Sequence, residues 1–488
     1  MRKLLLSSAA VLAVILATGA ARAAESAAPQ ASCPAFGWSE GLKRFLQPDA
    51  PFPTSDTQDP NAGDCAFQQW SEEAFVWATA LNSANVPRFM TFQTPAEFKL
   101  CPTCLAEPRR PRLRLASRAV VHPVGIAGAA ASAEGAGAIV EADGNMLVAH
   151  NGYPVYASVH MTPGYFNTAQ ANLVASGGYQ SQDSYFNEGD AVFKATWLRL
   201  ADNEAPPPGA FVTEADVPVL KKEQRMGGYT VLPDGQKYVT AKVALVGLHV
   251  VGYTANHPEF LWATFEQHSN TPRTPDNSFC TVKSQTCTVT SDSDSYTFYS
   301  ANTQFSTVNL PNPPTPPITP PVPPQLKFDV ASQRFTPANN AVLENKTGGA
   351  TFGSNPQADI ANVSSQTSGF LKGQKGEQSA FASYDLIGTV WMSSNFYVAG
   401  NPAALSANQT NAVGSLNLAN STAETFEQVA NVQPAGNIQN CFMCHNATTL
   451  PQPQFKPRRV AISHVLEFGT QWAVPNLLNV PEALPPPK

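Results

Sequence analysis

Ala244-Leu245-Val246-Gly247-Leu248-His249-Val250-Val251 is the stretch that decides the fold class of this chain. Its side chains are apolar at odd and even positions alike, so a strand formed here would be buried on both faces. We therefore expect Tyr238 to Tyr253 to be a central strand of a sheet, with Ala191 to Leu200 as a second strand. Asp234-Gly235, just before this run, is typical of a hairpin turn.

His249 interrupts the apolar run and is therefore predicted to be buried. It is either a core histidine with both ring nitrogens hydrogen-bonded or a polar group that lines a pocket. A second unusual stretch, His257 to His268, gathers aromatic residues, two carboxylates and two histidines in twelve residues. Such density is typical of an aromatic strand with solvated ends, but it also suits the wall of a site.

The composition of the whole chain favours a mainly β fold with a few short helices. Of 488 residues, 43 are proline and 14% are charged, which disfavours long helical bundles and favours strands joined by irregular segments. We expect a β-sandwich-like domain. One helix is predicted after Asp64, and a shorter one after Ser421, where Glu424 completes a capping box. The net charge of -6 gives no reason to expect nucleic acid as a partner.

The N-terminus has the pattern of a secretory signal peptide. Met1-Arg2-Lys3 is basic, Leu4 to Ala20 is apolar and uncharged, and Ala21-Arg22-Ala23 offers a small-x-small cleavage site. The apolar run is short for a membrane span, and no later segment approaches one. We therefore expect an exported protein with no membrane span in the mature chain.

Near the other end, Asn440-Cys441-Phe442-Met443-Cys444-His445 has the spacing for covalent attachment of one haem. Cys441 and Cys444 would form thioether bonds to the haem, and His445 would supply a nitrogen ligand to the iron. The alternatives are a short-loop disulfide and half of a zinc site. Zinc would need a second ligand pair, and the other Cys-x-x-Cys, at 101–104, is followed by Leu105. We expect haem c and, together with the signal peptide, a periplasmic location.

These features divide the chain into five parts. They are a signal peptide (1–23), an N-terminal helical and cysteine-containing segment (24–115), a mainly β domain (116–308), a proline-rich linker (309–325) and a loop-rich C-terminal c-type haem region (326–488). The linker is expected to be extended polyproline. Since only 43 residues follow His445 and many are prolines, no long terminal helix is available to cover a haem. We therefore expect the haem region to pack against the β domain.

The cysteines outside the haem motif are even in number and suggest up to three disulfides, whose connectivity the sequence leaves open. They are Cys33, Cys65, Cys101, Cys104, Cys280 and Cys287. Cys280 with Cys287, across a short hairpin-like loop, is our first choice of pair. Cys101 and Cys104 are interpreted as structural cysteines, because the prolines of Glu107 to Pro111 block the helix that a redox-active motif normally begins.

Basic residues occur in two places. Arg109, Arg110, Arg112, Arg114 and Arg118 form either a solvated strand face or a docking patch for an acidic redox partner. Lys456, Arg458 and Arg459 follow the haem motif and either bind the haem propionates or form a solvent-exposed basic turn.

The sixth ligand of the iron is not a downstream methionine, because none follows Met443. If residues 460–468 form a strand, His464 shares an apolar face with Val460 and Ile462, and we expect it to be the axial ligand. His249 is the second choice. In the alternative, His464 is hydrogen-bonded to backbone and the iron is five-coordinate or bound to water.

Several segments together resemble a known group of proteins. They are Lys194 to Trp197, Val246 to His249, Trp262 to Glu266, Leu386 to Trp391, Leu418 to Gln428 and the haem motif, in this order. This set resembles exported bacterial proteins with one haem motif near the C-terminus, described as cytochrome c family proteins. The resemblance implies an architecture for roughly residues 140–470 and no particular reaction. This chain departs from the pattern at Ile462-Ser463-His464, where related sequences often have an acidic and aromatic stretch.

Three classes of function fit these observations. A monohaem cytochrome that transfers electrons to a redox partner needs only the haem and a docking face. A haem enzyme of peroxidase or oxygenase type would need a polar group over an open sixth site, for which His249, His268 and Glu266 are candidates. A haem-stapled ligand-binding protein is the third. The large β domain exceeds what a simple carrier needs, which keeps enzyme activity in consideration.

Overall fold

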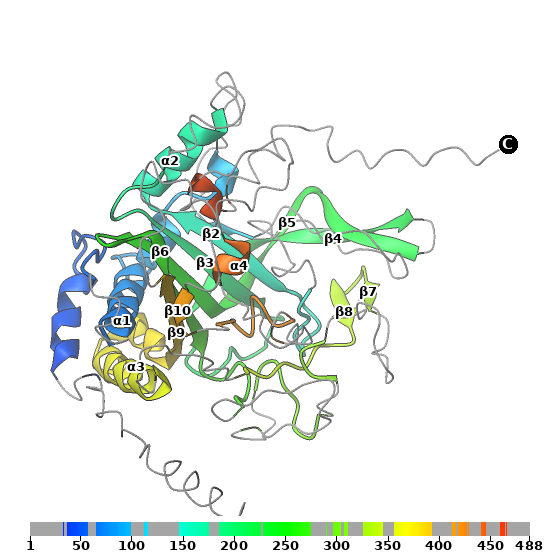
Figure 1. The fold of residues 1–488 in the computed structure, drawn as a ribbon. Helices are drawn as coiled ribbons and strands as arrows, with labels where there is room; N and C mark the ends of the chain where they lie inside the picture. Colours follow the sequence, from blue (N-terminus) through cyan, green and yellow to red (C-terminus); the bar gives the residue numbers. More distant parts are fainter. Residues whose placement is uncertain are drawn as a thin grey trace, which may run out of the picture.

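The structure of the protein is a computed structural model. It describes residues 33, 37–56, 65–98, 112–115, 146–174, 185–225, 228–274, 289, 296–303, 307–310, 326–344, 356–392, 412–415, 418–426, 428, 441–445, 459–463 and 465. The fold is mainly β with a few helices, as the composition predicts (Figure 1).

One eight-stranded sheet forms the body of the molecule. Its strands are β1 (Leu113–Arg114), β2 (Val155–Met161), β3 (Ala191–Arg199), β4 (Val212–Arg225), β5 (Gly228–Thr254), β6 (His257–Gln267), β9 (Tyr384–Met392) and β10 (Ala412–Gly414). The long strand β5 pairs with β4 over its first part and with β3 and β6 over its second part, all antiparallel. Beyond β6 the sheet continues through β9 to β10. A separate hairpin consists of β7 (Lys327–Asp329) and β8 (Arg334–Thr336).

The two strands predicted from the sequence are confirmed as β3 and the second part of β5. The hairpin turn predicted at Asp234-Gly235 is wrong, because both residues lie inside β5. The register explains the signal: Pro218 pairs with Tyr238 but Leu220 pairs with Pro233, so the residues between bulge out of the ladder. The Asp-Gly pair marks an irregularity within one strand instead of a reversal of the chain.

The helices surround this sheet. They are α1 (Cys65–Thr79), α2 (Pro163–Val174), α3 (Pro356–Lys372) and α4 (Cys441–Cys444), with 3-10 segments η1 (Trp38–Leu46), η2 (Arg88–Thr91), η3 (Pro95–Glu97), η5 (Gly376–Ser383) and η9 (Arg459–Ile462). The helix predicted after Asp64 is confirmed as α1. The helix predicted after Ser421 is wrong, since residues 421–426 form turns. None of the helices in the described ranges is both long and apolar enough to cross a membrane.

The two faces of the sheet bury different segments. On one face, Phe193, Val250 and Ala263 pack in a large apolar cluster with Trp70 and Phe75 of α1. Figure 1 shows α1 and α3 side by side on this flank. On the other face, Val251, Phe260 and Val390 pack in a second cluster with residues of α2, α4 and η9.

The segment that carries the haem motif therefore packs directly on the sheet. The side chains of Phe442, Val460 and Ile462 are at most 1% exposed in the second cluster. Strands β9 and β10 follow the proline-rich segment 309–325 in sequence, yet they complete the same sheet as β1 to β6. One sheet thus contains strands from both of the segments that the sequence divides at 309–325.

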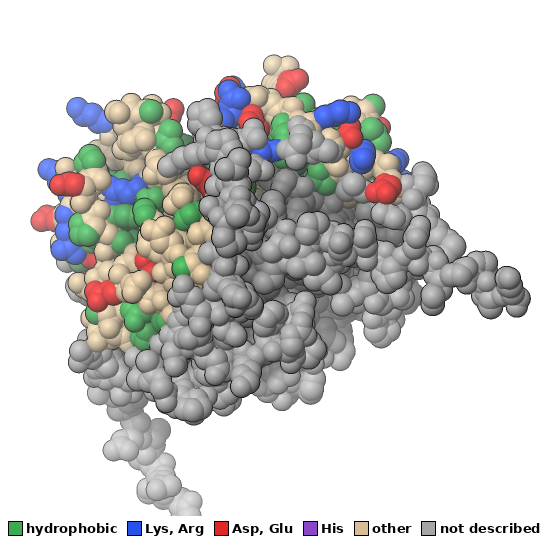
Figure 2. All heavy atoms as spheres, turned by 90° about the horizontal axis from the view of Figure 1, so that it is seen from above, with side chains coloured by type: hydrophobic (Ala, Val, Ile, Leu, Met, Phe, Trp, Pro, Cys, Tyr) green, Lys and Arg blue, Asp and Glu red, His purple; other side chains and the backbone are tan. Residues whose placement is uncertain are grey.

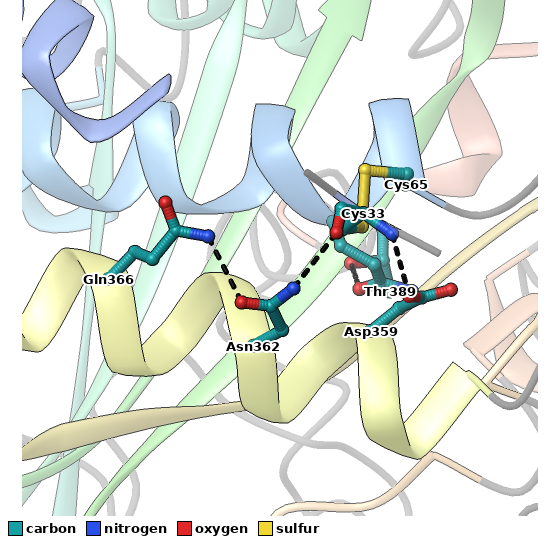
Figure 3. The surroundings of a disulfide bond; sticks show 7 residues. Cys33, Cys65, Asp359, Asn362, Gln366 and Thr389 are labelled. Atoms are coloured by element: carbon teal, nitrogen blue, oxygen red, sulfur yellow. Dashed lines mark hydrogen bonds between the residues drawn. A yellow bond between two sulfur atoms is a disulfide. The ribbon is translucent and has the colours of Figure 1, made fainter. Parts of the chain in front are cut away.

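One disulfide, between Cys33 and Cys65, joins the N-terminal segment to the start of α1 (Figure 3). The backbone around Cys33 is also tied to α3. Its N–H donates to Asp359 Oδ1 at 2.9 Å, and its carbonyl accepts from Asn362 Nδ2 at 2.9 Å. Cys101, Cys104, Cys280 and Cys287 lie outside the described residues, so the pair predicted between Cys280 and Cys287 stays a prediction.

Candidate functional site

The haem motif begins with a single helical turn, α4. The N–H of His445 donates to the Cys441 carbonyl at 2.8 Å, so the histidine continues the helical register of the two cysteines. Phe442, the second residue of the motif, is fully buried and anchors the turn to the sheet. The backbone of Cys441, Cys444 and His445 is therefore fixed relative to the sheet.

The imidazole of His445 has a defined tautomer. Its Nδ1 lies 3.0 Å from the carbonyl oxygen of Ile462. A carbonyl only accepts hydrogen bonds, so Nδ1 carries the proton, and in the neutral ring Nε2 carries the lone pair. This is the usual arrangement of a metal-binding histidine, whose second nitrogen is hydrogen-bonded to backbone or carboxylate so that the ring orientation is fixed. The residues present therefore fit an iron-bound imidazole.

Trp262 of β6 forms a wall beside this imidazole. The two ring centroids are 4.4 Å apart and the rings are tilted by 42°. Phe442 packs edge-on to the same indole, with centroids 5.9 Å apart. The aromatic stretch noted in the sequence thus contributes a side chain to the haem motif.

A row of apolar residues forms the floor under the motif. The register of the sheet aligns them as cross-strand neighbours, which share one face. They are Met161 of β2, Val192 of β3, Val251 of β5, Trp262 of β6 and Val390 of β9. All five belong to the apolar cluster that contains Phe442 and Ile462.

The next row along the same face is polar. Glu424 Oε1 lies 3.1 Å from His249 Nε2 and 3.8 Å from Lys194 Nζ. Burial raises the pKa of Glu424, but the charges of His249 and Lys194 and the hydrogen bonds from His249 and the Asn420 N–H outweigh it, so the pKa is held below its ordinary value. The predicted burial of His249 is only partly met, because its side chain is 19% exposed, and its Nε2 is engaged by the hydrogen-bond contact with Glu424.

The two other candidate polar groups have structural partners. Glu266 is almost fully buried and accepts hydrogen bonds from the N–H and hydroxyl of Ser421. It lies four residues from Trp262 on β6, roughly 13 Å along the strand. His268 is 76% exposed, and its Nδ1 is 2.9 Å from Asp385 Oδ2, which raises the pKa of the histidine. Neither residue belongs to the apolar cluster around Phe442.

Several predicted residues fall outside the described part of the chain. These are Arg458 and His464, together with the side chains of Cys444 and Arg459. The strand predicted over 460–468 is wrong where the structure describes it, because Arg459–Ile462 is a 3-10 segment. Ser463 N–H closes its turn on the Val460 carbonyl at 3.1 Å, and this turn leaves the Ile462 carbonyl to accept from His445.

The basic cluster at 109–118 is partly neutralised. Arg112 lies 3.2 Å from Asp216 and 3.6 Å from Glu214, and the Arg114 guanidinium stacks over the Tyr238 ring at 4.0 Å. On the described part of the face in Figure 2, basic and acidic side chains are likewise interspersed. Arg112 is exposed and paired with acidic residues, which fits a solvated strand face, whereas Arg114 is half-buried. Arg109, Arg110 and Arg118 lie outside the described residues.

Comparisons of the chain with protein families, curated proteins and solved structures find no match. Among the described side chains there is no group of three or more His, Cys, Asp or Glu residues that could hold a metal ion.

Two features of the site were missed from the sequence. The Ile462 carbonyl is a backbone acceptor, so its role does not depend on the type of residue and cannot be predicted from the sequence. Trp262 was seen only as part of an aromatic stretch, and its place beside His445 follows from the pairing of β6 between β5 and β9.

Proposed function

We propose that the protein is a periplasmic monohaem c-type cytochrome that transfers electrons through a haem attached to Cys441 and Cys444, with His445 as an iron ligand. The observation that carries this proposal is the hydrogen bond from His445 Nδ1 to the Ile462 carbonyl, which directs Nε2 as the metal ligand. The signal peptide and the Cys33–Cys65 disulfide agree with an oxidising compartment after export.

The bound haem would supply a one-electron couple at the iron. The chain's own contribution is to fix the ligand and to limit water. His445 is oriented by Ile462 and Trp262, and the apolar row beneath the motif lowers the dielectric on that side. Arg458 and Arg459 are proposed to bind the propionates, since a guanidinium fork matches a carboxylate.

Covalent attachment is the first test. The full chain, produced in a bacterial host with c-type maturation, should show a covalent haem by intact mass and a pyridine haemochrome spectrum. Cys441→Ser with Cys444→Ser should lose essentially all of it, because both thioether bonds are removed. Cys280→Ser with Cys287→Ser is the matched control and should keep it. A wild-type protein without haem in a host that matures other c-type cytochromes would overturn the proposal.

A second function, a haem enzyme of peroxidase or oxygenase type, is favoured by one observation about the sixth position. Ile462 binds His445 at Nδ1, the nitrogen remote from a metal on Nε2. The two residues from Ile462 to His464 span at most about 7 Å, so the backbone of His464 stays close to the carbonyl that binds His445. This counts against His464, and the pairing of His249 with Glu424 counts against His249.

Spectra of the sixth position separate the two functions. If His464 is the ligand, the oxidised iron is low-spin and the reduced protein binds carbon monoxide slowly, whereas His464→Ala is high-spin and binds it readily. If the sixth site is open, the wild type is already high-spin and binds carbon monoxide, and His464→Ala changes nothing. Peroxide turnover by the wild type with a general electron donor would then establish the enzyme alternative.

A further inference from the structure

The indole of Trp262 is held by a second contact besides that with His445. Its Nε1 donates to the backbone carbonyl of Glu259 at 3.2 Å. The hydrogen bond and the contact with the imidazole together leave the indole little freedom to rotate. A movement of the Glu259 backbone would therefore be passed to the ring that packs on His445.

The backbone next to Glu259 is strained. Phe260 has a φ of 70°, in the left-handed region that bulky residues rarely adopt. Such a conformation is unfavourable, persists only where its surroundings over-determine it, and is concentrated at functional sites. Phe260 lies between the carbonyl that binds the indole and Trp262 itself.

The Glu259 side chain supplies the restraint. It is fully buried, and its Oε1 accepts from the Met392 N–H of β9 at 3.2 Å and lies 2.8 Å from His257 Nδ1. Its Oε2 is also buried and has no hydrogen-bond partner. A carboxyl group buried at such a cost, between two neighbouring strands, fixes the start of β6 relative to β9.

We propose that Trp262 is a positioning residue for the axial imidazole of His445 and that buried Glu259 acts through it. This inference rests on the proposed function, because it concerns the ligand that the haem would use. The orientation and environment of an axial histidine tune the reduction potential of the iron, so the unit of Glu259 and Trp262 sets the potential of this cytochrome.

The test uses the haem-loaded full chain. Trp262→Leu removes the ring, and Trp262→Phe keeps an aromatic face but loses the N–H. The matched control is Trp391→Phe, which alters an indole stacked on Phe67 on the other face of the sheet, with centroids 3.9 Å apart. The readouts are the reduction potential, the electron paramagnetic resonance spectrum of the oxidised iron and the midpoint of thermal unfolding.

We expect Trp262→Leu to change the equilibrium constant for reduction about tenfold, which is a shift of 59 mV for one electron. Its paramagnetic spectrum should also change, because the imidazole loses its wall. Trp262→Phe should give a smaller shift. Trp391→Phe should lower the unfolding midpoint and leave the potential and the spectrum as in the wild type.

A double-mutant cycle tests the role of Glu259. Removing a buried carboxylate could alter the potential directly, so Glu259→Ala alone is ambiguous. If Glu259 acts through Trp262, the double variant with Trp262→Leu shifts the potential no further than Trp262→Leu alone. Glu259→Gln, which can still accept from the Met392 N–H, should restore the wild-type potential. Additive shifts would overturn the role of Glu259.

The inference and the proposed function fail in different ways. A wild-type chain without covalent haem overturns the proposed function. A haem-loaded Trp262→Leu protein with unchanged potential and spectrum overturns the positioning role alone. If Trp262→Leu does not fold, the comparison of Trp262→Phe with Trp391→Phe decides, and equal potentials in these two variants overturn the role.

Discussion

Glu72→Gln should remove a loss of stability that the wild-type protein undergoes between about pH 5 and pH 8. Glu72 lies on α1, is 1% exposed, and faces Ser364 and Thr367 of α3. Burial raises its pKa from an ordinary value of 4.5 to about 8, and hydrogen bonds from Ser364 and Thr367 offset only part of this effect. One of its carboxyl oxygens, Oε1, has no hydrogen-bond partner, as suits a group that is neutral in the folded state.

The sign follows from proton binding. The folded protein holds the Glu72 proton more tightly than the unfolded chain, so this contribution is complete below pH 4.5 and is lost as the pH rises through about 8. The shift corresponds to a loss on the order of 5 kcal/mol, since one pKa unit is worth about 1.4 kcal/mol. Glutamine has a similar shape and no charge, so the variant should be the more stable protein at pH 8.

Urea unfolding at pH 5, 6.5 and 8 measures the effect as the difference between wild type and variant. Other titrating groups affect both proteins equally and cancel in that difference. Glu40→Gln, an exposed glutamate on η1, is the control and should show no such trend. A difference between wild type and Glu72→Gln that is constant over this pH range would contradict the burial of a neutral Glu72.

The burial of Glu72 is a feature of α1 that the sequence does not predict. The spacing of Phe67, Trp70 and Trp77 predicts the helix and one apolar stripe correctly. Gln68, Ser71 and Glu72 are polar and lie outside that stripe, yet they are buried as well. Gln68 and Ser71 hydrogen-bond to Thr389 of β9. Glu72 faces α3, whose own sequence is too polar to show the periodicity of a packed helix.

The candidate site likewise has one part that the sequence predicts and one part that it does not. The spacing of Cys441, Cys444 and His445 is local, so the sequence alone predicts the ligand. Trp262 lies next to His445 because of the register of the sheet, and Ile462 because of the path of the chain after the motif. Neither is visible in a local sequence pattern. The bulge in β5 determines which residues of that strand lie on the sheet face that carries the motif. Thr196 pairs with Gly247 and Trp197 with Leu245, so the register skips Val246 and brings Gly247 and His249 onto the face that carries the motif.

Gly247→Val should destabilise the protein by about 4 kcal/mol or more, because the residue lies directly under the segment 418–428. A Cβ atom at Gly247 would be 2.5 Å from Thr196 Oγ1, 2.6 Å from Thr422 Oγ1 and 2.9 Å from Asn420 Oδ1. The segment would be forced off the sheet. Several buried polar groups would then lose their partners, each at a cost of about 1–3 kcal/mol.

The buried hydrogen bonds between segment 418–428 and the sheet are the interactions that this substitution should break. Ser421 N–H donates to Glu266 at 2.6 Å, Asn420 Nδ2 to Thr264 Oγ1 at 2.8 Å, and Thr196 shares a 2.7 Å hydroxyl bond with Thr422. Glu424, which pairs with His249 on the sheet face that carries the haem motif, lies on the same segment. Urea unfolding measures the loss, and the spectrum of the haem proposed at Cys441 and Cys444 reports whether the disturbance extends to the motif.

Gly369→Ala provides a control of opposite sign. Gly369 is exposed in the last turn of α3, and apart from its chain neighbours and the helix's own backbone no atom lies within 4 Å of its added Cβ. Alanine there should stabilise the protein by up to about 1 kcal/mol, because it restricts the unfolded chain and favours the helix. If Gly247→Val unfolded at the same urea concentration as the wild type, segment 418–428 would not be seated on Gly247. The polar row that joins Lys194, His249 and Glu424 would then have to be held by contacts other than those of Asn420, Ser421 and Thr422.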